Sequence, residues 1–198
     1  MSRIEVPEGM AADAAQTWPH PELVNSFLGN FDFSEMPDAG ATEELTEFRE
    51  VLGRFGSGVT VVTSATADGP AGMTCQSFSA LSLRPPLVLF APAKTSRAWP
   101  LIHRAGHFTV NLLGAEQQEV STRFATPQAD KFAGVEWTPS EEFGDPHLAG
   151  CLGWVDCKVH KVHAEGDHYI VVGRVLRLIA GSADDPLIFY RANYRQLD

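Results

Sequence analysis

The sequence predicts a single mainly β domain, a small barrel that carries a few short helices. The chain has 198 residues and 44% hydrophobic content, which is enough to fill one core but not two large ones. Between residues 59 and 190, six or so apolar or β-branched runs alternate with turn residues, whereas helical periodicity is confined to three short segments. Because strands outnumber helices in this way, we expect the strands to close into a barrel.

The first quarter of the chain differs from the rest in charge. Residues 1–50 carry eleven acidic and two basic residues, a balance of −9, whereas the remaining residues carry fourteen and thirteen, a balance of −1. We expect residues 1–42, which also contain four prolines, to be an acidic N-terminal extension and residues 43–198 to form the domain. The extension is either a mobile tail or an arm that docks on a partner subunit through four large aromatic residues: Trp18, Phe27, Phe31 and Phe33.

The domain is expected to begin with a helix from Thr42 to Phe55. Its apolar residues recur at spacings of three, four and three and form one stripe: Leu45, Phe48, Leu52 and Phe55. Gly56 and Gly58 end the helix. Because this glycine-rich stretch ends a helix and lacks the GxGxxG and GxxxxGK[ST] patterns, it does not indicate a Rossmann or P-loop phosphate site.

Strands and two further helices follow. Helices are expected from Ser96 to Arg104, broken near Pro100, and from Ala115 to Ala125, where Thr126-Pro127 stops the second one. The two longest strands are joined across a turn at residues 164–167. The expected strands are Val59 to Ala65, Ala71 to Gln76, Leu87 to Ala91, Phe108 to Leu113, Leu152 to His163, Tyr169 to Ile179 and Leu187 to Tyr190.

Metal and covalent chemistry are not expected. Cys157, His160 and His163 have a spacing that resembles metal ligands, but on a regular strand Cys157 and His163 share one face and His160 points to the other. The three side chains then cannot converge on one ion. Ser57 is not part of a GxSxG elbow, and Cys75 has no sequence neighbour that would lower its pKa.

The composition also restricts the cellular compartment and the classes of binding partner that we expect. The longest charge-free apolar run, Leu87 to Ala91, has about five residues, whereas a membrane helix needs ~20. The N-terminus lacks the apolar segment of a secretory signal, and three cysteines do not suggest a disulfide framework. We therefore expect a cytoplasmic protein with reduced thiols and no membrane partner. The chain lacks a basic stripe with interleaved aromatic residues, so no nucleic acid is expected either.

Two polar stretches are candidates for ligand binding. Met73 to Ser82 is dense in hydroxyl groups, contains the amide of Gln76 and has no charge. Such donors suit a planar heteroaromatic ring with several acceptors, although an ordinary strand-to-loop transition explains the composition equally well. Ala93 to Arg97 offers two cations and two hydroxyls after a strand, and it is either a phosphate site or a solvated loop.

Seven motifs between residues 45 and 198 occur in an order that is specific when taken together. They are Phe48 to Thr63, Gly72 to Val88, Phe108 to Leu113, Arg123 to Ala125, Asp130 to Phe132, Gly166 to Val175, and Pro186 to Tyr190 with Tyr194. This series resembles the flavin reductase-like, FMN-binding split-barrel family. The long acidic N-terminus falls outside the resemblance.

The resemblance implies a homodimeric Greek-key split barrel that binds FMN or FAD. In this family, NADH or NADPH delivers hydride to the flavin, and the reduced flavin leaves for a separate flavin-dependent monooxygenase component. Hydride transfer needs no protein nucleophile and no metal, because the protein only has to stack two rings and stabilise negative charge on the flavin. Two alternatives are a split barrel that keeps its FMN and acts on an organic substrate, and a flavin-binding protein without turnover.

The resemblance also assigns roles to residues. His168 is expected to line the nicotinamide side as the catalytic residue, or merely to cap its hairpin. The expected contacts of the flavin ring and ribityl chain are Thr74, Cys75, Gln76 and Ser77, assisted by Ser79 or Ser82. Those of the phosphate region are Lys94, Thr95 and Ser96, with Phe124, Ala125 and Lys131 nearby.

Overall fold

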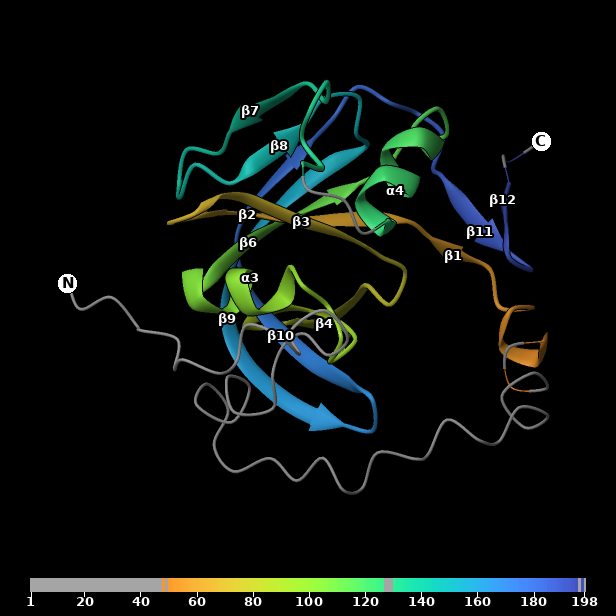
Figure 1. The fold of residues 1–198 in the computed structure, drawn as a ribbon, viewed down its shortest axis with the longest axis horizontal. Coiled ribbons are helices and arrows are strands. Elements are labelled where there is room, and N and C mark those ends of the chain that lie inside the picture. Colours follow the sequence, from red (N-terminus) through yellow and green to blue (C-terminus); the bar gives the residue numbers. More distant parts are fainter. Residues whose placement is uncertain (1–47, 49, 127–129, 196, 198) are drawn as a thin grey trace, which may run out of the picture.

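The computed structural model describes residues 48, 50–126, 130–195 and 197, so the predicted N-terminal extension lies outside the described residues. Its main feature is a seven-stranded antiparallel sheet with the strand order β3-β2-β6-β9-β10-β5-β4. The strands are β2 (Thr60–Thr66), β3 (Gly69–Cys75), β4 (Ser79–Leu83), β5 (Pro86–Phe90), β6 (His107–Leu112), β9 (Gly153–Glu165) and β10 (His168–Ala180). The sheet curls around a core, which confirms the predicted mainly β split barrel (Figure 1).

The core forms because alternate residues of each strand are apolar and point to the same side of the sheet. The Phe90 and Phe108 rings meet edge to face with centroids 5.1 Å apart, and both side chains are fully buried. Trp99, which lies on a helix, packs against this core, and its ring centroid is 5.8 Å from that of Phe90. Tyr169, at the start of β10, is also buried in this cluster.

Two helices pack against the β2–β3 pair, α3 (Trp99–Ala105) on one side and α4 (Gln118–Ala125) on the other (Figure 1). The expected break at Pro100 is wrong, because Pro100 lies in the first turn of α3, where no intrahelical N–H bond is required. Gly106 ends α3 with φ 78°, a left-handed conformation that suits glycine. Thr126 ends α4, as predicted.

Short strands complete the domain, and only one of them, the strand expected from Leu187 to Tyr190, was predicted from the sequence. A three-stranded sheet contains β1 (Ser57–Gly58), β11 (Ile188–Tyr190) and β12 (Asn193–Arg195), and a hairpin contains β7 (Trp137–Pro139) and β8 (Pro146–Leu148). These strands, and β4 in the main sheet, are short or rich in proline and polar residues, so their sequences show little periodicity. The hairpin and α4 cover a second apolar cluster that includes Phe124, Leu148 and Leu187.

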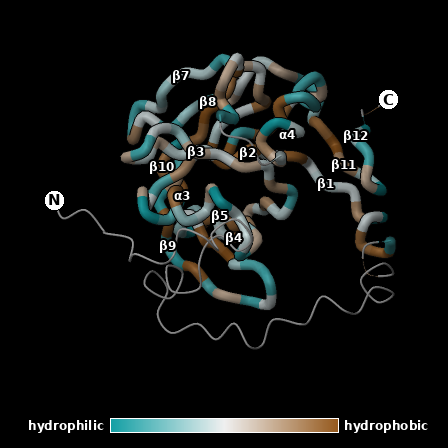
Figure 2. The backbone as a smooth tube through the Cα atoms, viewed as in Figure 1, coloured by the Kyte–Doolittle hydropathy of each residue, from teal (hydrophilic) through white to brown (hydrophobic). Residues whose placement is uncertain are grey.

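The long β9–β10 hairpin contains an irregularity that changes the side to which residues point. Its tight, hydrophilic turn is formed by Gly166 and Asp167 (Figure 2). Lys161 pairs with Val172 and Val159 pairs with Gly173, so His160 is an extra residue in a β-bulge. The bulge resets the alternation: Cys157 is buried, whereas His160 and His163 are both exposed. The prediction that Cys157 and His163 share a face is therefore wrong. No group of three or more His, Cys, Asp or Glu residues within the described ranges could hold a metal ion.

The predicted first helix is only partly described. Phe48 and residues 50–52 are helical, and the chain turns at residues 53 and 54. The described part of its apolar stripe does not pack on the domain, because Phe48, Leu52 and Phe55 are 63%, 54% and 82% exposed. Leu45 lies outside the described residues. No helix in the described part of the chain is both long and apolar enough to cross a membrane.

Candidate active site

A cavity of about 1100 Å³ runs along β3, the strand at one end of the sheet order. Among the described residues β3 pairs only with β2, so every second residue of β3 directs its backbone N–H and C=O groups away from β2. Ten of the thirteen predicted site residues line this cavity: Thr74, Cys75, Gln76, Ser77, Thr95, Ser96, Phe124, Ala125, Lys131 and His168. The fold therefore brings together residues that are almost a hundred positions apart in the sequence.

Neutral donors form the end of the cavity at the C-terminus of β3. The Cys75 Sγ atom lies 3.1 Å from the Ser77 Oγ atom, and the Ala91 N–H donates to Ser77 Oγ at 2.8 Å. Burial raises the pKa of the Cys75 thiol, so this group is a neutral donor and not a thiolate nucleophile. Gln76, between these two residues, is exposed and also lines the cavity.

The Thr74 hydroxyl is bonded within the protein, and Thr74 also lines the cavity. It donates to the Ser121 carbonyl oxygen at 2.6 Å and so fastens α4 to β3. Phe124, one turn further along α4, lies so close to Gly72 that an added Cβ there would come within 2.6 Å of its ring. This close contact sets the distance between α4 and β3 and forms one wall of the cavity.

Lys94, a predicted phosphate contact, is buried beside the cavity. Its side chain is 4% exposed and does not line the cavity, and its ammonium nitrogen lies 5.8 Å from the centroid of the Tyr169 ring. Ala93 and Thr95 line the cavity on either side of it, and Lys94 itself lies in a turn in which the Ser96 N–H donates to the Ala93 carbonyl oxygen at 2.9 Å. Burial lowers the pKa of Lys94, with a smaller opposing effect of Asp167 and Glu165.

Arg97 is a further cation of the cavity and was not among the predicted site residues. It is exposed and lines the cavity beside Lys131, whose pKa is lowered first by burial and then by the positive charge of Arg97. The Lys131 ammonium group is held by a 2.6 Å bond to the Phe124 carbonyl oxygen. Two cations near enough for one to lower the pKa of the other suit a phosphate group, because an anion between them relieves their repulsion. Arg97 belongs to the predicted cationic cluster, so the sequence contained the signal but not the direction of the side chain.

Two serines of the prediction lie outside the cavity. Ser79 and Ser82 are on β4, where they pair with Leu89 and Leu87 of β5. The chain leaves the cavity at residues 76–78 and enters β4, which carries both serines away from it. The structure therefore separates Ser79 and Ser82 from Cys75 and Ser77.

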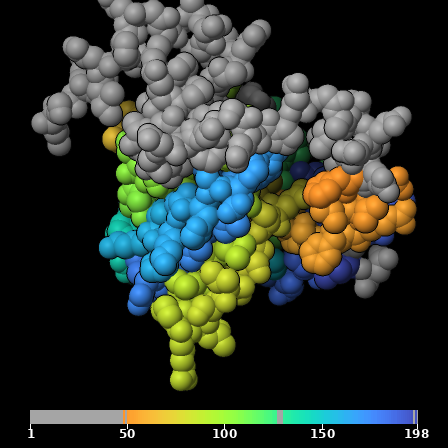
Figure 3. Space-filling view, turned by 90° about the horizontal axis from the view of Figure 1, so that it is seen from below, coloured from red at the N-terminus to blue at the C-terminus, as the bar shows by residue number. Residues whose placement is uncertain are grey.

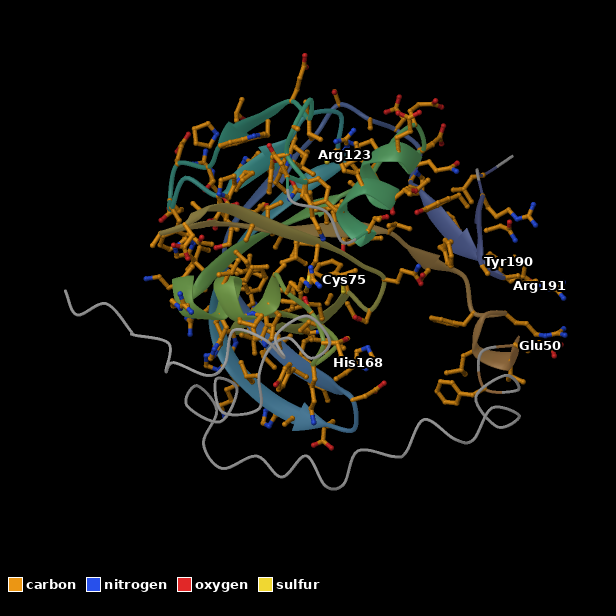
Figure 4. The ribbon with its side chains drawn as sticks, in the orientation of Figure 1. Glu50, Cys75, Arg123, His168, Tyr190 and Arg191 are labelled. Carbon is orange, nitrogen blue, oxygen red and sulfur yellow. The ribbon has the colours of Figure 1, made fainter. Side chains whose placement is uncertain are left out.

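His168 stands at the start of β10, where it pairs with Ala93 on the cavity wall. Its Nδ1 atom lies 2.7 Å from Asp167 Oδ1, and this bond holds the pKa of Asp167 below its usual range. Since an ionised carboxylate only accepts hydrogen bonds, His168 Nδ1 carries the proton of this bond. The imidazole is 46% exposed, so it can reach a ligand in the cavity. Figure 4 shows His168 and Cys75 in the same central region, away from Tyr190 and Arg191.

Comparisons with known proteins agree with this geometry. Residues 52–198 match the family model described as flavin reductase like domain. The reductase subunit HsaB of a flavin-dependent monooxygenase from Mycobacterium tuberculosis is 48% identical over 153 residues, which cover 76% of this chain and 81% of that protein. The FMN reductase (NADH) SmoA from Agrobacterium fabrum is 44% identical, with coverage of 74% and 83%.

A solved structure shows the same fold. Nitrilotriacetate monooxygenase component B from Mycobacterium thermoresistibile superposes with a TM-score of 0.76 at 47% identity. The match covers 78% of this chain and 87% of that one. The similarity therefore extends over most of the domain that the structure describes.

Proposed function

Because the chain belongs to the flavin reductase like family, we propose that the cavity along β3 binds flavin and the reduced nicotinamide that reduces it. The protein is an NAD(P)H:flavin oxidoreductase that supplies reduced flavin to a partner monooxygenase. One observation supports this position of the site above all others. The cavity places neutral donors at one end and two cations further along, which is the order of a flavin ring and its phosphate.

In this proposal the flavin is a substrate that accepts a hydride from the reduced nicotinamide. Cys75, Ser77 and the outward backbone groups of β3 orient the ring and donate hydrogen bonds to its acceptors. Arg97 and Lys131 hold the phosphate. His168, kept in one orientation by Asp167, positions the nicotinamide, while α4 shields one wall of the cavity from water.

We also propose NADH as the donor and a homodimer as the assembly. NADH is favoured because SmoA, an NADH-dependent FMN reductase by name, is 44% identical to this chain. The dimer is favoured by large exposed apolar side chains, among them Leu83 at 90% and Leu178 at 70%. Figure 3 shows the β9–β10 hairpin and the β4–β5 segment next to each other on one face of the molecule.

A steady-state assay tests the proposed reaction. The purified protein is mixed with NADH or NADPH and with added FMN, FAD or riboflavin, and nicotinamide oxidation is followed by absorbance at each flavin concentration. We expect oxidation of NADH that rises and saturates with free flavin. A rate that does not depend on added flavin would contradict the proposal, and light scattering on the same sample tests the dimer.

A further inference from the structure

The bulge at His160 gathers cations on one face of the β9–β10 hairpin. Lys158 and Lys161 are three residues apart, so on a regular strand their side chains would point to opposite faces. Because the bulge inserts one residue between them, both side chains point away from the core, whereas Val159 and Val162 pack against it. His160 and the two lysines are all exposed.

Strand β10 adds a further cation directly opposite. Arg174 is exposed and pairs with Lys158 across the hairpin. His163, which pairs with Ile170, continues the row towards the turn and is also exposed. We call this surface the cationic face; its residues are Lys158, His160, Lys161, His163 and Arg174.

The domain does not neutralise the charges of the cationic face. Among the described residues, no ion pair joins Lys158, Lys161 or Arg174 to a carboxylate. The Lys158 ammonium group lies 5.4 Å from the centroid of the Phe143 ring, a contact that leaves its charge in place. Because like charges that face each other across a hairpin repel, an anionic segment bound there would stabilise the pair.

The neighbouring carboxylates are directed elsewhere. Glu165 and Asp167, at the turn of the hairpin, both act on Lys94, because they oppose the larger effect by which burial lowers its pKa. Glu141, between β7 and β8, pairs with Arg177. The cationic face therefore keeps an excess of positive charge.

Apolar side chains adjoin these cations on the same side of the sheet. Leu87 of β5 pairs with Arg174, and Leu89 pairs with Val172. Both leucines are only half-buried, and Ile170 is 37% exposed. Since paired residues share one face of a sheet, the surface combines cations with apolar area. It suits a partner that carries carboxylates and apolar rings together.

The chain itself contains a segment of this chemistry. Residues 1–42 carry seven acidic residues and one basic residue, a balance of −6, together with four large aromatic residues. Rings and carboxylates lie closest together in the stretch Phe31-Asp32-Phe33-Ser34-Glu35. Because this extension belongs to the same chain, it meets the cationic face at a higher effective concentration than a separate protein does.

We propose that the cationic face is the docking site of the N-terminal extension, residues 1–42. Carboxylates of the extension neutralise Lys158, Lys161 and Arg174 through charge-assisted hydrogen bonds. Its aromatic side chains cover the apolar area beside these cations and stack on the cations themselves. The extension is then an arm held on the sheet, not a free tail.

This docking site is separate from the other two sites that we propose. None of the five residues of the cationic face lines the cavity along β3. Leu178, a proposed dimer contact, pairs with the core residue Val155 and so lies on the opposite side of the hairpin. The proposal therefore does not rest on the proposed function.

Carbodiimide cross-linking of the whole protein tests the proposal, because this reagent joins carboxylates to amines in direct contact. The chain has four lysines: Lys158 and Lys161 belong to the cationic face, and Lys94 and Lys131 are the internal comparison. We expect mass spectrometry to find carboxylates of residues 1–42 linked to Lys158 or Lys161. These links should be lost at about 1 M salt, where the Debye length is about 3 Å. No links to these two lysines, or equal linking to Lys131, would overturn the proposal.

Charge reversal gives a second test, with chymotrypsin as the probe because it cleaves after the large aromatic residues of the extension. The variant carries Lys158→Glu and Lys161→Glu. The control carries Arg191→Glu and Arg195→Glu, which change the net charge equally on exposed residues outside the hairpin; Figure 4 shows Arg191 far from His168. Thermal melting of each protein checks that it is folded.

Reversal on the cationic face should speed cleavage within residues 1–42 about five- to tenfold, because cleavage follows the fraction of undocked extension. The control should be cleaved as slowly as the wild type. About 1 M salt should accelerate cleavage of the wild type, which requires no variant to fold. Equal cleavage rates in all three proteins would overturn the proposal and leave the cationic face to a separate acidic partner.

Discussion

Polar residues gather in two regions of this molecule, and the regions differ in how their groups are bonded. One is a buried network among β2, β6, β8 and β9, which we call the clamp; its residues are Thr63, Thr109, Asn111, His147 and Asp156. The other is the cavity along β3. In the clamp, most polar atoms bond to other parts of the protein, whereas the cavity presents exposed groups such as Gln76, Arg97 and Thr95 to its interior.

The clamp joins the β7–β8 hairpin to the barrel. Asp156 Oδ1 accepts a 2.5 Å bond from the Thr109 hydroxyl and lies 2.7 Å from His147 Nε2. Asn111 donates to the Val61 carbonyl at 3.0 Å and accepts from the Leu148 N–H at 2.7 Å. A second His–Asp pair, His107 with Asp145, lies nearby and is separate from the cavity.

The contrast indicates which polar residues specify the fold and which bind. Buried polar groups that bond to each other offer nothing to a ligand, and removing one leaves its partners unsatisfied. Polar groups that face a cavity can be removed with little effect on folding but with a loss of ligand affinity. Substitutions in the clamp and in the cavity should therefore have different effects.

The largest effect is expected in the clamp. Asp156→Ala leaves the Thr109 hydroxyl and His147 without their shared acceptor and should lower the free energy of unfolding by about 2–5 kcal/mol. Urea unfolding measures this loss. Glu141→Ala, which removes an exposed partner of Arg177, is the control and should change stability little. Similar results for the two variants would show that the clamp does not stabilise the fold.

The second effect is expected at the cations of the cavity. Arg97→Ala removes a charge-assisted contact worth ~1.5–3 kcal/mol, so FMN binding should weaken roughly ten- to hundredfold. Riboflavin, which lacks the phosphate, should bind almost as before. Lys94→Ala is the critical comparison, because Lys94 lies outside the cavity. Removal of the Lys94 side chain should change the affinities for FMN and riboflavin equally. A selective loss of FMN binding in Lys94→Ala would contradict our placement of the phosphate.

A third, smaller effect concerns pH. The pKa of Lys131 is lowered by burial and by Arg97, and a bound phosphate favours the protonated amine. The preference for FMN over riboflavin should therefore be complete below the pKa of the free protein and decline as pH rises through the higher pKa of the FMN complex. Titration of both flavins across the alkaline range measures this decline. In Lys131→Ala the preference should be smaller and should no longer fall, and a persistent fall in that variant would implicate another group.

The smallest effect is expected at His168. Because its imidazole is 46% exposed, His168→Ala should raise the KM for NADH several-fold while flavin affinity stays nearly the same. His163→Ala, on the same hairpin but outside the cavity, is the control and should have no effect. Unchanged kinetics in both variants would show that His168 does not take part in NADH binding and is only a residue of the hairpin turn.

The fold was largely predictable from the sequence, because the long strands and both described helices carry clear periodicity. Short strands such as β7 and β12 were missed, since three residues are too few to show a period. The β-bulge at His160 was missed for a related reason: a single inserted residue leaves the apolar pattern almost intact but reverses the direction of every side chain beyond it.

The site was predictable in its segments but less so in its side chains. The resemblance located the polar stretch of β3 and the cluster after β5, and most of their residues do line one cavity. Lys94 and Arg97 belong to the same short cationic cluster. The resemblance could therefore not show that the Lys94 side chain points into the core and the Arg97 side chain into the cavity. Trp137 gave no signal at all, since it reaches the cavity only through the packing of a hairpin that is far from β3 in the sequence.

The central claim, that flavin binds along β3, can be tested directly at Cys75. This thiol lines the cavity, whereas Cys151 and Cys157 are fully buried elsewhere. Alkylation of each cysteine is followed over time by peptide mass spectrometry at mildly alkaline pH, with and without saturating FMN. We predict that FMN slows alkylation of Cys75 at least tenfold and leaves the other two cysteines unchanged. Alkylation of Cys75 at the same rate with and without FMN, in protein that still reduces FMN with NADH, would contradict the claim.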